Sequence, residues 1–409
     1  MNKPVELMDV DAVLRVLVQA AAARAPVESV STMDALGRIL AESVQSPIDV
    51  PPAANTQMDG YAVRCADIGA AGVRLRVTQR IAAGHVGEPV KPGEAARIFT
   101  GALIPDGADA VVMQEQCVAD GEHVLIQHVP EPGEWVRPTG CDVQRGSTVL
   151  HTGHRLRPQD LGQAASVGVS SLRVARRPRV ALLSTGDELT MPGTALRPGA
   201  IYNSNRFLLT GLLQGLGCQI TDLGQIPDRL DATCEAIQSA AQAHDLVLTS
   251  GGVSVGGEDH VKPAVQALGE LNLWQIAMKP GKPLAFGSVR RATGAGSAHF
   301  IGLPGNPVSS FVTFVVFVRP FLLALQGATR LAPSVLHLPS ASNWPRGDRR
   351  REFLRARLTD DARVELFANQ NSAVLTSTVW GDGLVDNPPN CTFQAGDTVS
   401  FIPFSSLLS

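Results

Sequence analysis

The chain has 409 residues, of which 44% are hydrophobic and 18% are charged, and its formal net charge is -3. This length fits two to four domains. The charge balance argues against a nucleic acid as a main partner, because nucleic-acid binding needs clustered Lys and Arg.

The cysteines and the apolar segments favour a cytoplasmic protein. The six cysteines are scattered without a C-x-x-C pair, which argues against a disulfide framework and a zinc site and fits a reducing compartment. The first residues, MNKPVELMDVDAV, carry acids where a signal peptide has its basic region, so we expect no export. The most apolar window, Phe311–Leu325, is interrupted by Arg319 and Pro320 and predicts a buried helix rather than a membrane span.

The first half of the chain predicts a two-segment linker domain with a β domain inserted into it. Apolar residues at helical spacing between Leu7 and Val18 predict an amphipathic N-terminal helix of about four turns. A strand, a short helix at 33–38 and another extended piece follow, up to the prolines at 47–52. Short strands separated by Gly and Pro then predict a small β domain over 47–146. We therefore assign 1–46 and 147–177 to the linker domain.

From Val180 the pattern changes to alternating strands and helices, which predicts an α/β domain with a doubly wound parallel sheet over 178–328. The expected strands are 180–184, 218–224, 245–249, 276–279 and 299–303. The expected helices are 205–216, 230–244 and two that begin at 260 and 308. The last segment, 329–409, is again mostly β and predicts a small barrel or sandwich.

The stretch DLVLTSGGVSVGGEDHVK, residues 245–262, carries the clearest chemical signal. A buried strand is followed by a loop whose glycines let backbone N–H groups converge on an anion. These glycines are Gly251, Gly252, Gly256 and Gly257. Glu258 and Asp259 come next, and carboxylates beside a phosphate site need a cation such as Mg²⁺ between them. The alternative is a loop whose glycines only turn the chain and whose acids cap the next helix.

Other acids and lysines follow the ends of neighbouring strands. They are Asp187, Glu188, Asp228, Lys279 and Lys282, together with Pro304–Pro307. Because ligands bind at the carboxyl ends of parallel strands, we expect one site that handles a phosphorylated ligand with Mg²⁺. In the β domain, Asp59, Thr100 and Asp142 lie in or near glycine turns, where a turn-stabilising role is the alternative.

Six motifs in fixed order resemble the MoeA family of molybdopterin molybdenumtransferases, which is also similar to the C-terminal part of gephyrin. They are NTQMDGYAV, RIFTGALIPDGADAVVMQE, LSTGDEL, SGGVSVGGEDHVK, MKPGKP and GLPGNPVSS, and the resemblance runs from Met8 to Phe404. It implies an elongated homodimer with a linker domain, an inserted β domain, an α/β domain that binds molybdopterin and nucleotide, and a C-terminal β barrel. It also implies transient contacts with other proteins of molybdenum cofactor biosynthesis, and neither membrane nor nucleic acid as a partner.

The implied reaction takes adenylylated molybdopterin and molybdate as substrates and depends on magnesium. The pyrophosphate link is cleaved and AMP is released as molybdenum enters the dithiolene. The family's acidic cluster around the phosphate and the metal matches four positions, of which Asp228 and Asp259 are the expected magnesium ligands. The four are Asp187, Glu188, Asp228 and Asp259.

The resemblance also implies substrate-binding residues and a contribution from the second subunit. The substrate-binding residues are Ser250, Gly251, Gly252, Ser254, Lys279, Lys282, Pro304, Pro307, Arg137, Arg351 and Ser372, with Arg355 as a looser match. Asp59, Thr100, Arg137 and Asp142 match residues that face the partner's cleft. Gln275 departs from the family, since some members have a lysine there, and this departure predicts a less positive phosphate subsite.

Two other functions remain open from the sequence. One is the adenylyltransferase of the preceding step, which shares the α/β domain but does not need the other domains. The other is a scaffold role of the gephyrin type, in which the C-terminal surface of the dimer holds partner peptides.

Overall fold

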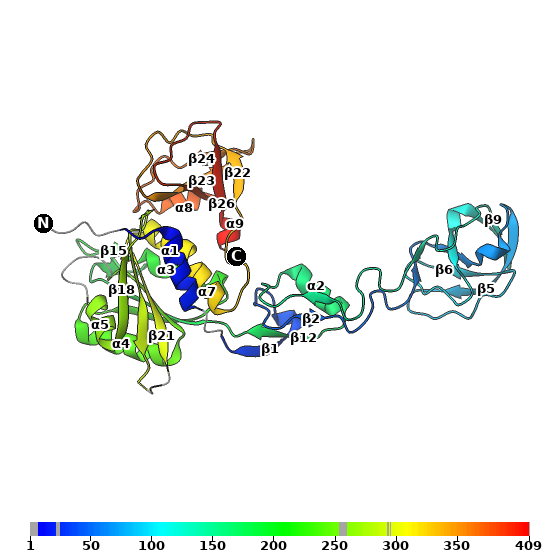
Figure 1. Cartoon of the computed structure of the whole chain (residues 1–409), viewed down its shortest axis with the longest axis horizontal. Helices are drawn as coiled ribbons and strands as arrows, with labels where there is room; N and C mark the ends of the chain where they lie inside the picture. Colours follow the sequence, from blue (N-terminus) through cyan, green and yellow to red (C-terminus); the bar gives the residue numbers. More distant parts are fainter. Residues whose placement is uncertain (1–6, 22–24, 253–259, 293, 295, 409) are drawn as a thin grey trace.

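The computed structural model of the chain describes residues 7–21, 25–252, 260–292, 294 and 296–408. These residues form an elongated molecule (Figure 1). The α/β domain and the C-terminal domain make up a body, and a slender linker domain joins this body to a distal β domain. The chain runs out to the distal domain and returns, so the linker domain consists of two segments.

The linker domain is held together by pairing between these two segments. β1 (Val27–Ser31) pairs antiparallel with β12 (Ser171–Ala175), and β2 (Val44–Gln45) pairs with β11 (Thr148–Leu150). α2 (Pro158–Ser166) covers them. The small core draws on both segments and consists of Ala35, Leu40, Leu150, Leu156, Ala164, Leu172 and Val174.

The prediction of a helix at 33–38 is wrong. The structure has only a single 3₁₀ turn, η1 (Thr32–Asp34), which begins at the Ser31 cap. Gly37 lies in the left-handed region with φ +73, a conformation that ends a helix.

A buried carboxylate anchors the first turn of α2. Asp160 is only 6% exposed, and its Oδ2 accepts a hydrogen bond from the Arg157 backbone N–H at 2.7 Å and lies 2.8 Å from His154 Nε2. Burial raises the pKa of the Asp160 carboxyl, but the hydrogen bonds from Arg157 and His154 outweigh burial and lower the pKa to about 2.

We expect Asp160→Asn to lower the free energy of unfolding at pH 7 by about 2 kcal/mol. A carboxyl whose pKa is lower in the folded chain stabilises the fold above its unfolded pKa, and this stability is lost as the pH falls through its folded pKa. The difference between wild type and variant should therefore shrink as the pH falls from about 4 towards 2. Urea unfolding of both proteins at pH 7, 5 and 3.5 measures this difference. A gap that widens on acidification would contradict the assignment, and Asp231→Asn, which removes an exposed carboxylate paired with Arg229, is the control with little effect.

The distal domain is a six-stranded sheet in the order β7-β4-β6-β5-β9-β8. Its strands are β4 (Gly60–Val63), β5 (Val73–Ile81), β6 (Glu94–Ile98), β7 (Ala110–Met113), β8 (Cys117–Asp120) and β9 (His123–Ile126). Two 3₁₀ turns, η2 (Cys65–Asp67) and η3 (Gln114–Gln116), interrupt the strands. At the end nearer the linker, β3 (Asn55–Thr56) pairs with β10 (Val136–Arg137).

The α/β domain has a six-stranded sheet in the order β16-β13-β17-β21-β20-β18. The strands are β13 (Arg179–Thr185), β16 (Gln219–Ile226), β17 (Leu246–Ser250), β18 (Gly269–Gln275), β20 (Pro283–Arg290) and β21 (Ser297–Leu303). The first four in spatial order are parallel, which confirms the expected fold class. β20 and β18 add an antiparallel edge that was not predicted. A short parallel pair, β14 (Leu189–Thr190) and β15 (Ile201–Tyr202), lies outside this sheet.

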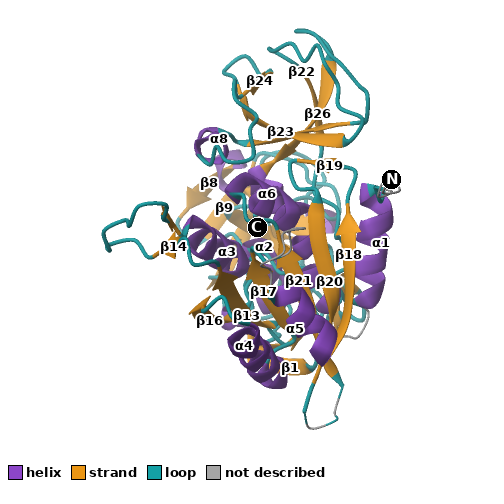
Figure 2. Ribbon diagram, turned by 90° about the vertical axis from the view of Figure 1, so that its left-hand side faces the viewer, coloured by secondary structure: helices purple, strands orange, loops and turns teal. Residues whose placement is uncertain are grey.

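Helices cover both faces of this sheet (Figure 2). α4 (Leu230–Ala243) and α5 (Val261–Leu268) pack on the face that carries Ala181 and Leu183. α3 (Ser204–Gly215) and a long helix over 307–325 pack on the other face. Because neighbouring residues of a strand point to opposite faces, each buried strand supplies both cores.

The N-terminal helix, α1 (Val10–Ala20), lies apart from the linker domain to which we assigned it. Its side chains Val10, Val13 and Leu17 are buried in the core of the α/β domain, where α1 packs against α7. The Met8 backbone N–H also donates to the Gln275 carbonyl at 2.8 Å. The apolar stripe of this helix predicts a partner surface but cannot say which domain provides it.

The long helix consists of α6 (Pro307–Thr313), a π-helical turn η4 (Phe314–Val318) and α7 (Arg319–Leu325). By length and composition it could cross a membrane, with a mean hydropathy of 2.1. However, 89% of its apolar window is buried inside the protein. It is therefore a core helix, as the interrupted apolar window predicted.

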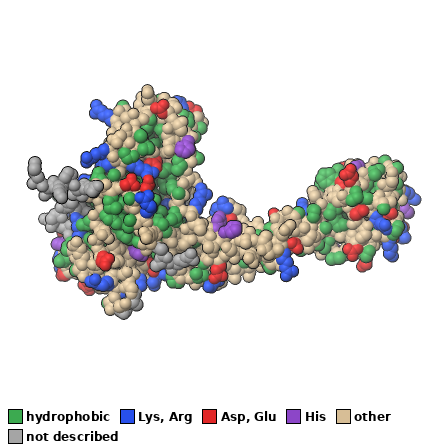
Figure 3. Space-filling model, viewed as in Figure 1, with side chains coloured by type: hydrophobic (Ala, Val, Ile, Leu, Met, Phe, Trp, Pro, Cys, Tyr) green, Lys and Arg blue, Asp and Glu red, His purple; other side chains and the backbone are tan. Residues whose placement is uncertain are grey.

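The C-terminal domain is a curved sheet in the order β19-β23-β25-β26-β22, with β24 paired to β23. The strands are β19 (Met278–Lys279), β22 (Leu336–Pro339), β23 (Arg351–Leu358), β24 (Val364–Leu366), β25 (Gly383–Asn387) and β26 (Thr398–Pro403). Two short helices, α8 (Thr376–Trp380) and α9 (Phe404–Leu407), complete it. The strand expected at 276–279 does not join the α/β sheet, because β19 pairs with β23 and carries the chain from one domain to the other. Acidic and basic side chains are interspersed on the face drawn in Figure 3.

Candidate active site

A cleft of about 730 Å³ opens at the carboxyl end of the parallel strands. The segments after β13, β16, β17 and β21 form one wall, and the C-terminal domain forms the other. Among the described residues, its charged side chains are Glu188, Asp228, Lys279, Lys282 and Arg350. Residues that follow several different strands thus meet at the carboxyl edge of the sheet, as the topology predicted, and residues of the C-terminal domain join them there.

Glycines after the strands leave the floor of the cleft open. Gly251 and Gly252 follow β17 with φ +88 and +68, a conformation that other residues rarely adopt. A Cβ on Gly252 would lie 2.4 Å from the Val261 side chain, so this position has no room for any side chain. The loop where we expected an anion cradle is therefore bare backbone at these two positions, and the Gly251 N–H donates to the Leu303 carbonyl at 3.0 Å. Gly256, Gly257 and Ser254 lie outside the described residues.

Two of the four expected acids line the cleft. Glu188 follows β13 and Asp228 follows β16. The Glu188 carboxylate lies against Gly186, where a Cβ would come within 2.6 Å of Oε2, so the glycine makes room for it. Asp187 is not among the lining residues, and its backbone carbonyl accepts from Arg197 Nη2 at 2.8 Å. Asp259 lies outside the described residues.

These two carboxylates fit magnesium as a partner of a phosphorylated ligand. Among the described residues no three His, Cys, Asp or Glu side chains gather to hold a metal by themselves. Mg²⁺ usually keeps one or two carboxylates and completes its shell with water and substrate phosphates. The donor set in the cleft suits that mode of binding.

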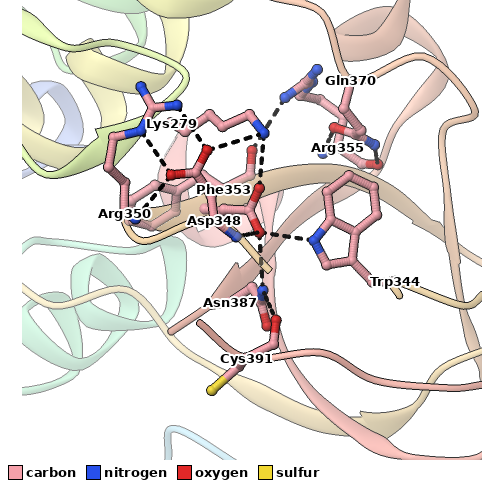
Figure 4. Close-up of polar contacts among 10 residues, drawn as sticks. Lys279, Trp344, Asp348, Arg350, Phe353, Arg355, Gln370, Asn387 and Cys391 are labelled. Carbon is pink, nitrogen blue, oxygen red and sulfur yellow. Dashed lines mark hydrogen bonds and ion pairs between the residues drawn. The ribbon is translucent and has the colours of Figure 1, made fainter. Parts of the chain in front are cut away.

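Two cations of the cleft, Lys279 and Arg350, form ion pairs with carboxylates of the C-terminal domain (Figure 4). Lys279 Nζ lies 3.1 Å from Glu352 Oε1 and 3.5 Å from Asp348 Oδ2. Arg350 holds Asp348 with two hydrogen bonds, at 3.0 and 2.8 Å. The hydrogen bonds from Arg350 lower the pKa of the Asp348 carboxyl well below its usual range, so it stays ionised beside both cations.

Glu352 is the buried centre of this network, with a side chain that is 0% exposed. Its Oε2 accepts from Trp344 Nε1 at 2.8 Å, from Asn387 Nδ2 at 3.2 Å and from the Asp348 backbone N–H at 3.2 Å. Its other oxygen faces Lys279. A fully bonded buried carboxylate thus fixes the position of a cleft lysine from the neighbouring domain.

The structure brings Arg350, not Arg351, to the cleft. Arg351 is the first residue of β23 and makes ion pairs with Asp386 at 2.6 Å and Asp11 at 2.9 Å. Arg355 is 1% exposed and donates to the Ser377 hydroxyl at 3.1 Å, so it has a structural place inside the domain. Choosing among Arg349, Arg350 and Arg351 requires the register of β23, which the sequence alone does not give.

Of the remaining residues that we expected to bind substrate, some line the cleft and others lie in the structure behind it. Pro304 and Ser372 line the cleft, and the Ser372 hydroxyl accepts from Asn306 Nδ2 at 3.2 Å. Ser250 is 5% exposed and accepts from Asn205 Nδ2 at 2.7 Å, while Pro307 begins α6. Gln275 is not a lining residue, so its departure from the family leaves the charge of this wall unchanged. Several lining residues were not predicted as binding residues, among them His260, Ser309, Arg350 and Gln370.

Three of the predicted residues, Asp59, Thr100 and Arg137, belong to the distal domain, which lies away from this cleft, beyond the linker domain (Figure 1). Asp59 accepts from the backbone N–H and the hydroxyl of Thr100, at 2.8 and 2.7 Å, and these bonds lower the pKa of the Asp59 carboxyl. Arg137 donates to Asn55 at 3.3 Å. Asp142 lies elsewhere, at a hollow of about 660 Å³ next to α2. Asp59 and Thr100 therefore contact each other, and among the described residues none that lines the cleft contacts either of them.

Comparison with known proteins accounts for nearly the whole chain. Residues 8–168 match the MoeA N-terminal region (domain I and II), 181–324 a probable molybdopterin binding domain, and 337–404 the MoeA C-terminal region (domain IV). The molybdopterin molybdenumtransferase of Haemophilus influenzae is 39% identical over 392 residues, which is 93% of this chain and 95% of that protein. Molybdopterin molybdenumtransferase 2 of Mycobacterium tuberculosis is 36% identical over 90% of this chain and 93% of its own length.

Solved structures agree. A crystal structure of a molybdopterin biosynthesis MoeA protein from Pyrococcus horikoshii has a TM-score of 0.79 at 32% identity and covers 98% of this chain and 99% of its own. A second has a TM-score of 0.84 at 27% identity and covers 97% of this chain and 100% of its own.

A molybdopterin-binding α/β domain with a ligand cleft, flanked by further domains that also match, defines a multidomain enzyme of molybdenum cofactor biosynthesis. The chain belongs to the MoeA family of molybdopterin molybdenumtransferases and is a transferase. The matched N- and C-terminal regions argue against the stand-alone adenylyltransferase, which has no use for them.

Proposed function

We propose that the cleft binds adenylylated molybdopterin and molybdate, and that the enzyme cleaves the pyrophosphate link and releases AMP as molybdenum enters the dithiolene. The reaction depends on magnesium. The observation that supports this proposal is the meeting of two carboxylates, Glu188 and Asp228, with Lys279, Lys282 and Arg350 in one cleft. A phosphorylated anion needs the cations, whereas the carboxylates are useful there only with a metal or a reacting centre.

The residues divide the work by charge and position. Lys282 and Lys279 neutralise the phosphates, with Lys279 fixed by Glu352. Asp228, together with Asp259, would hold Mg²⁺, which when bound supplies positive charge against the phosphate that is cleaved. Glu188, beside the open backbone at Gly186, orients molybdate as AMP leaves. Ser372 of the C-terminal domain and Asn306 of the segment after β21 offer a hydroxyl and an amide to the substrate oxygens.

The direct test incubates the purified chain with adenylylated molybdopterin, molybdate and Mg²⁺ and measures AMP. We expect AMP to form only when all three are present. AMP that forms equally well without molybdate would mean simple hydrolysis and would contradict metal insertion. Tungstate in place of molybdate shows how narrowly the oxyanion is selected.

We further propose that the enzyme works in the cytoplasm as a homodimer and makes transient contacts with other proteins of the pathway. Within one chain, Asp59 and Thr100 lie beyond the linker domain from the cleft, so they reach a cleft only in a second subunit. The linker domain also exposes two large apolar side chains close together in sequence, Met33 at 86% and Leu36 at 54%. Exposed apolar surface of this kind is typical of protein–protein contacts.

Shared clefts predict complementation between inactive variants. Asp59→Ala and Glu188→Gln should each release little AMP alone, but mixing them under conditions that exchange subunits should restore about a quarter of the wild-type clefts, since half the dimers are mixed and each has one intact site. AMP release before and after exchange measures this. A mixture of Asp228→Asn with Glu188→Gln is the matched control and should stay inactive, because both changes fall on the same side of the cleft. Recovery in the control, or none in the test mixture, would contradict a shared site.

A further inference from the structure

A second cavity, of about 420 Å³, lies where the linker domain meets α7 and the segment that follows it. Its walls carry five basic side chains, and no Asp or Glu is among the described residues that line it. The basic residues are His154, Arg155, Arg157, Arg319 and Arg330. In the catalytic cleft the cations are accompanied by acids, whereas this cavity has only positive charge.

One of these arginines is compensated from outside the cavity. Arg157 pairs with Asp160 at 3.0 Å, and the same carboxylate contacts His154 at 2.8 Å. Among the described residues, the Arg155 side chain has only carbonyl partners, Gly37 at 3.3 Å and Gly215 at 3.0 Å. Arg330 donates to the Ser334 hydroxyl at 3.0 Å. In the described part of the chain neither Arg155 nor Arg330 forms an ion pair.

Arg319 is the most unusual of the group. Arg319 is only 6% exposed, and the one side-chain hydrogen bond that it makes among the described residues runs from Nη1 to the Leu331 carbonyl at 2.9 Å. Its Nε is buried and has no hydrogen-bond partner in the part of the chain that the structure describes. Burial lowers the pKa of Arg319 to about 10, and the positive charge of Arg155 adds to the effect. A buried guanidinium without a counter-charge costs stability, and a bound anion would remove that cost.

We propose that this cavity is a binding site for a small phosphate-type oxyanion, held by Arg319, Arg155 and Arg330. Guanidinium groups form paired, charge-assisted hydrogen bonds with such anions, and three of them without carboxylate partners are suited to a dianion. The source is either free inorganic phosphate or the phosphate group of a small metabolite, for which the cavity volume leaves room.

The three arginines come from different parts of the fold, so a bound anion would connect those parts. The linker domain supplies Arg155, the core helix supplies Arg319, and the connection to the C-terminal domain supplies Arg330. An anion bonded to all three would hold the linker domain, which carries the distal domain, against the core helix and the segment that follows it. The site is separate from the cleft and does not depend on the function proposed for it.

Thermal unfolding in the presence of inorganic phosphate tests the proposal on the full-length protein, with ionic strength held constant by chloride. We expect 10 mM phosphate to raise the wild-type Tm by about 2 °C or more. Arg319→Met keeps the length of the side chain but not its charge, and it should abolish the shift. Without phosphate this variant should melt no lower than wild type, because it removes an uncompensated buried charge.

Two further variants separate this site from other causes. Lys282→Ala weakens the catalytic cleft and should keep the phosphate shift, whereas Arg15→Met, which removes an exposed arginine on α1, should change nothing. Calorimetry then compares the affinities of ribose 5-phosphate and inorganic phosphate for the wild-type protein. If ribose 5-phosphate binds about tenfold more tightly, the ligand is a phosphorylated metabolite; if the affinities are equal, it is inorganic phosphate.

Three results would overturn the proposal. The first is a shift that survives in Arg319→Met, and the second is a shift lost only in Lys282→Ala. The third is a wild-type Tm that does not change with phosphate, together with an Arg330→Ser variant that light scattering shows to be a monomer where the wild type is a dimer. In that case an acidic side chain of a second copy covers the cavity.

Discussion

Glu188→Gln and Asp228→Asn should each reduce the rate of AMP release by at least about a hundredfold, and raising the magnesium concentration should restore only Asp228→Asn. Both side chains line the cleft, and the amide keeps their size while removing their charge. A lost metal ligand weakens binding, which mass action can offset. A lost interaction with the reacting centre cannot be offset in that way.

The measurement is a magnesium titration of AMP release for both variants. Asp187→Asn is the matched control, because Asp187 precedes Glu188 but does not line the cleft, and we expect it to retain most of the activity. The melting temperatures of all three should stay close to that of wild type. If high magnesium rescued Glu188→Gln and left Asp228→Asn inactive, the two roles would be reversed.

Glu352→Gln should lower the free energy of unfolding by about 3 kcal/mol and raise KM for the substrate by about tenfold. The carboxylate is fully buried and accepts from Trp344 and Asn387 as well as facing Lys279. An amide places a donor where one of these donors now points, so at least one buried polar group loses its partner. Lys279 also loses the charge that fixes it in the cleft.

Urea unfolding and steady-state kinetics measure the two effects separately. Glu365→Gln is a suitable control, since Glu365 pairs with Arg357 at 2.7 Å in the same domain but is 39% exposed. A Glu352→Gln protein with normal stability and normal KM would show that the network neither supports the domain nor positions Lys279. Reduced stability with an unchanged KM would limit Glu352 to a structural role.

Much of the cleft could be predicted from the sequence because its residues directly follow buried strands. Glu188, Asp228 and Gly251 come within a few residues of a strand end, and parallel topology brings such positions together whatever the details of packing. Lys279 and Lys282 reach the same edge by a different route. They precede β20, and the start of an antiparallel strand lies at the carboxyl end of its parallel neighbours.

The site residues and strands that could not be predicted depend on strand register and on contacts between segments that are distant in the sequence. Arg350 was missed because one residue of register separates it from Arg351, which points to Asp386. Glu352 lies within a strand of another domain, so nothing local relates it to Lys279. β18 was overlooked because it alternates apolar and polar residues, as an exposed edge strand does, and does not resemble the apolar strands beside it.

The two-segment linker domain also sets an order of folding. Val27 in β1 pairs with Ala175 in β12, and the whole distal domain is synthesised between them. During translation the first linker segment must therefore wait, with its apolar side chains unpaired, until the distal sheet has emerged and folded. Because the folded distal domain brings its two ends together at β3 and β10, it shortens the effective loop that β1 and β12 have to close. A substitution that slows the folding of the distal sheet would therefore delay the linker and leave its half-made core exposed to aggregation, far from the place that was changed.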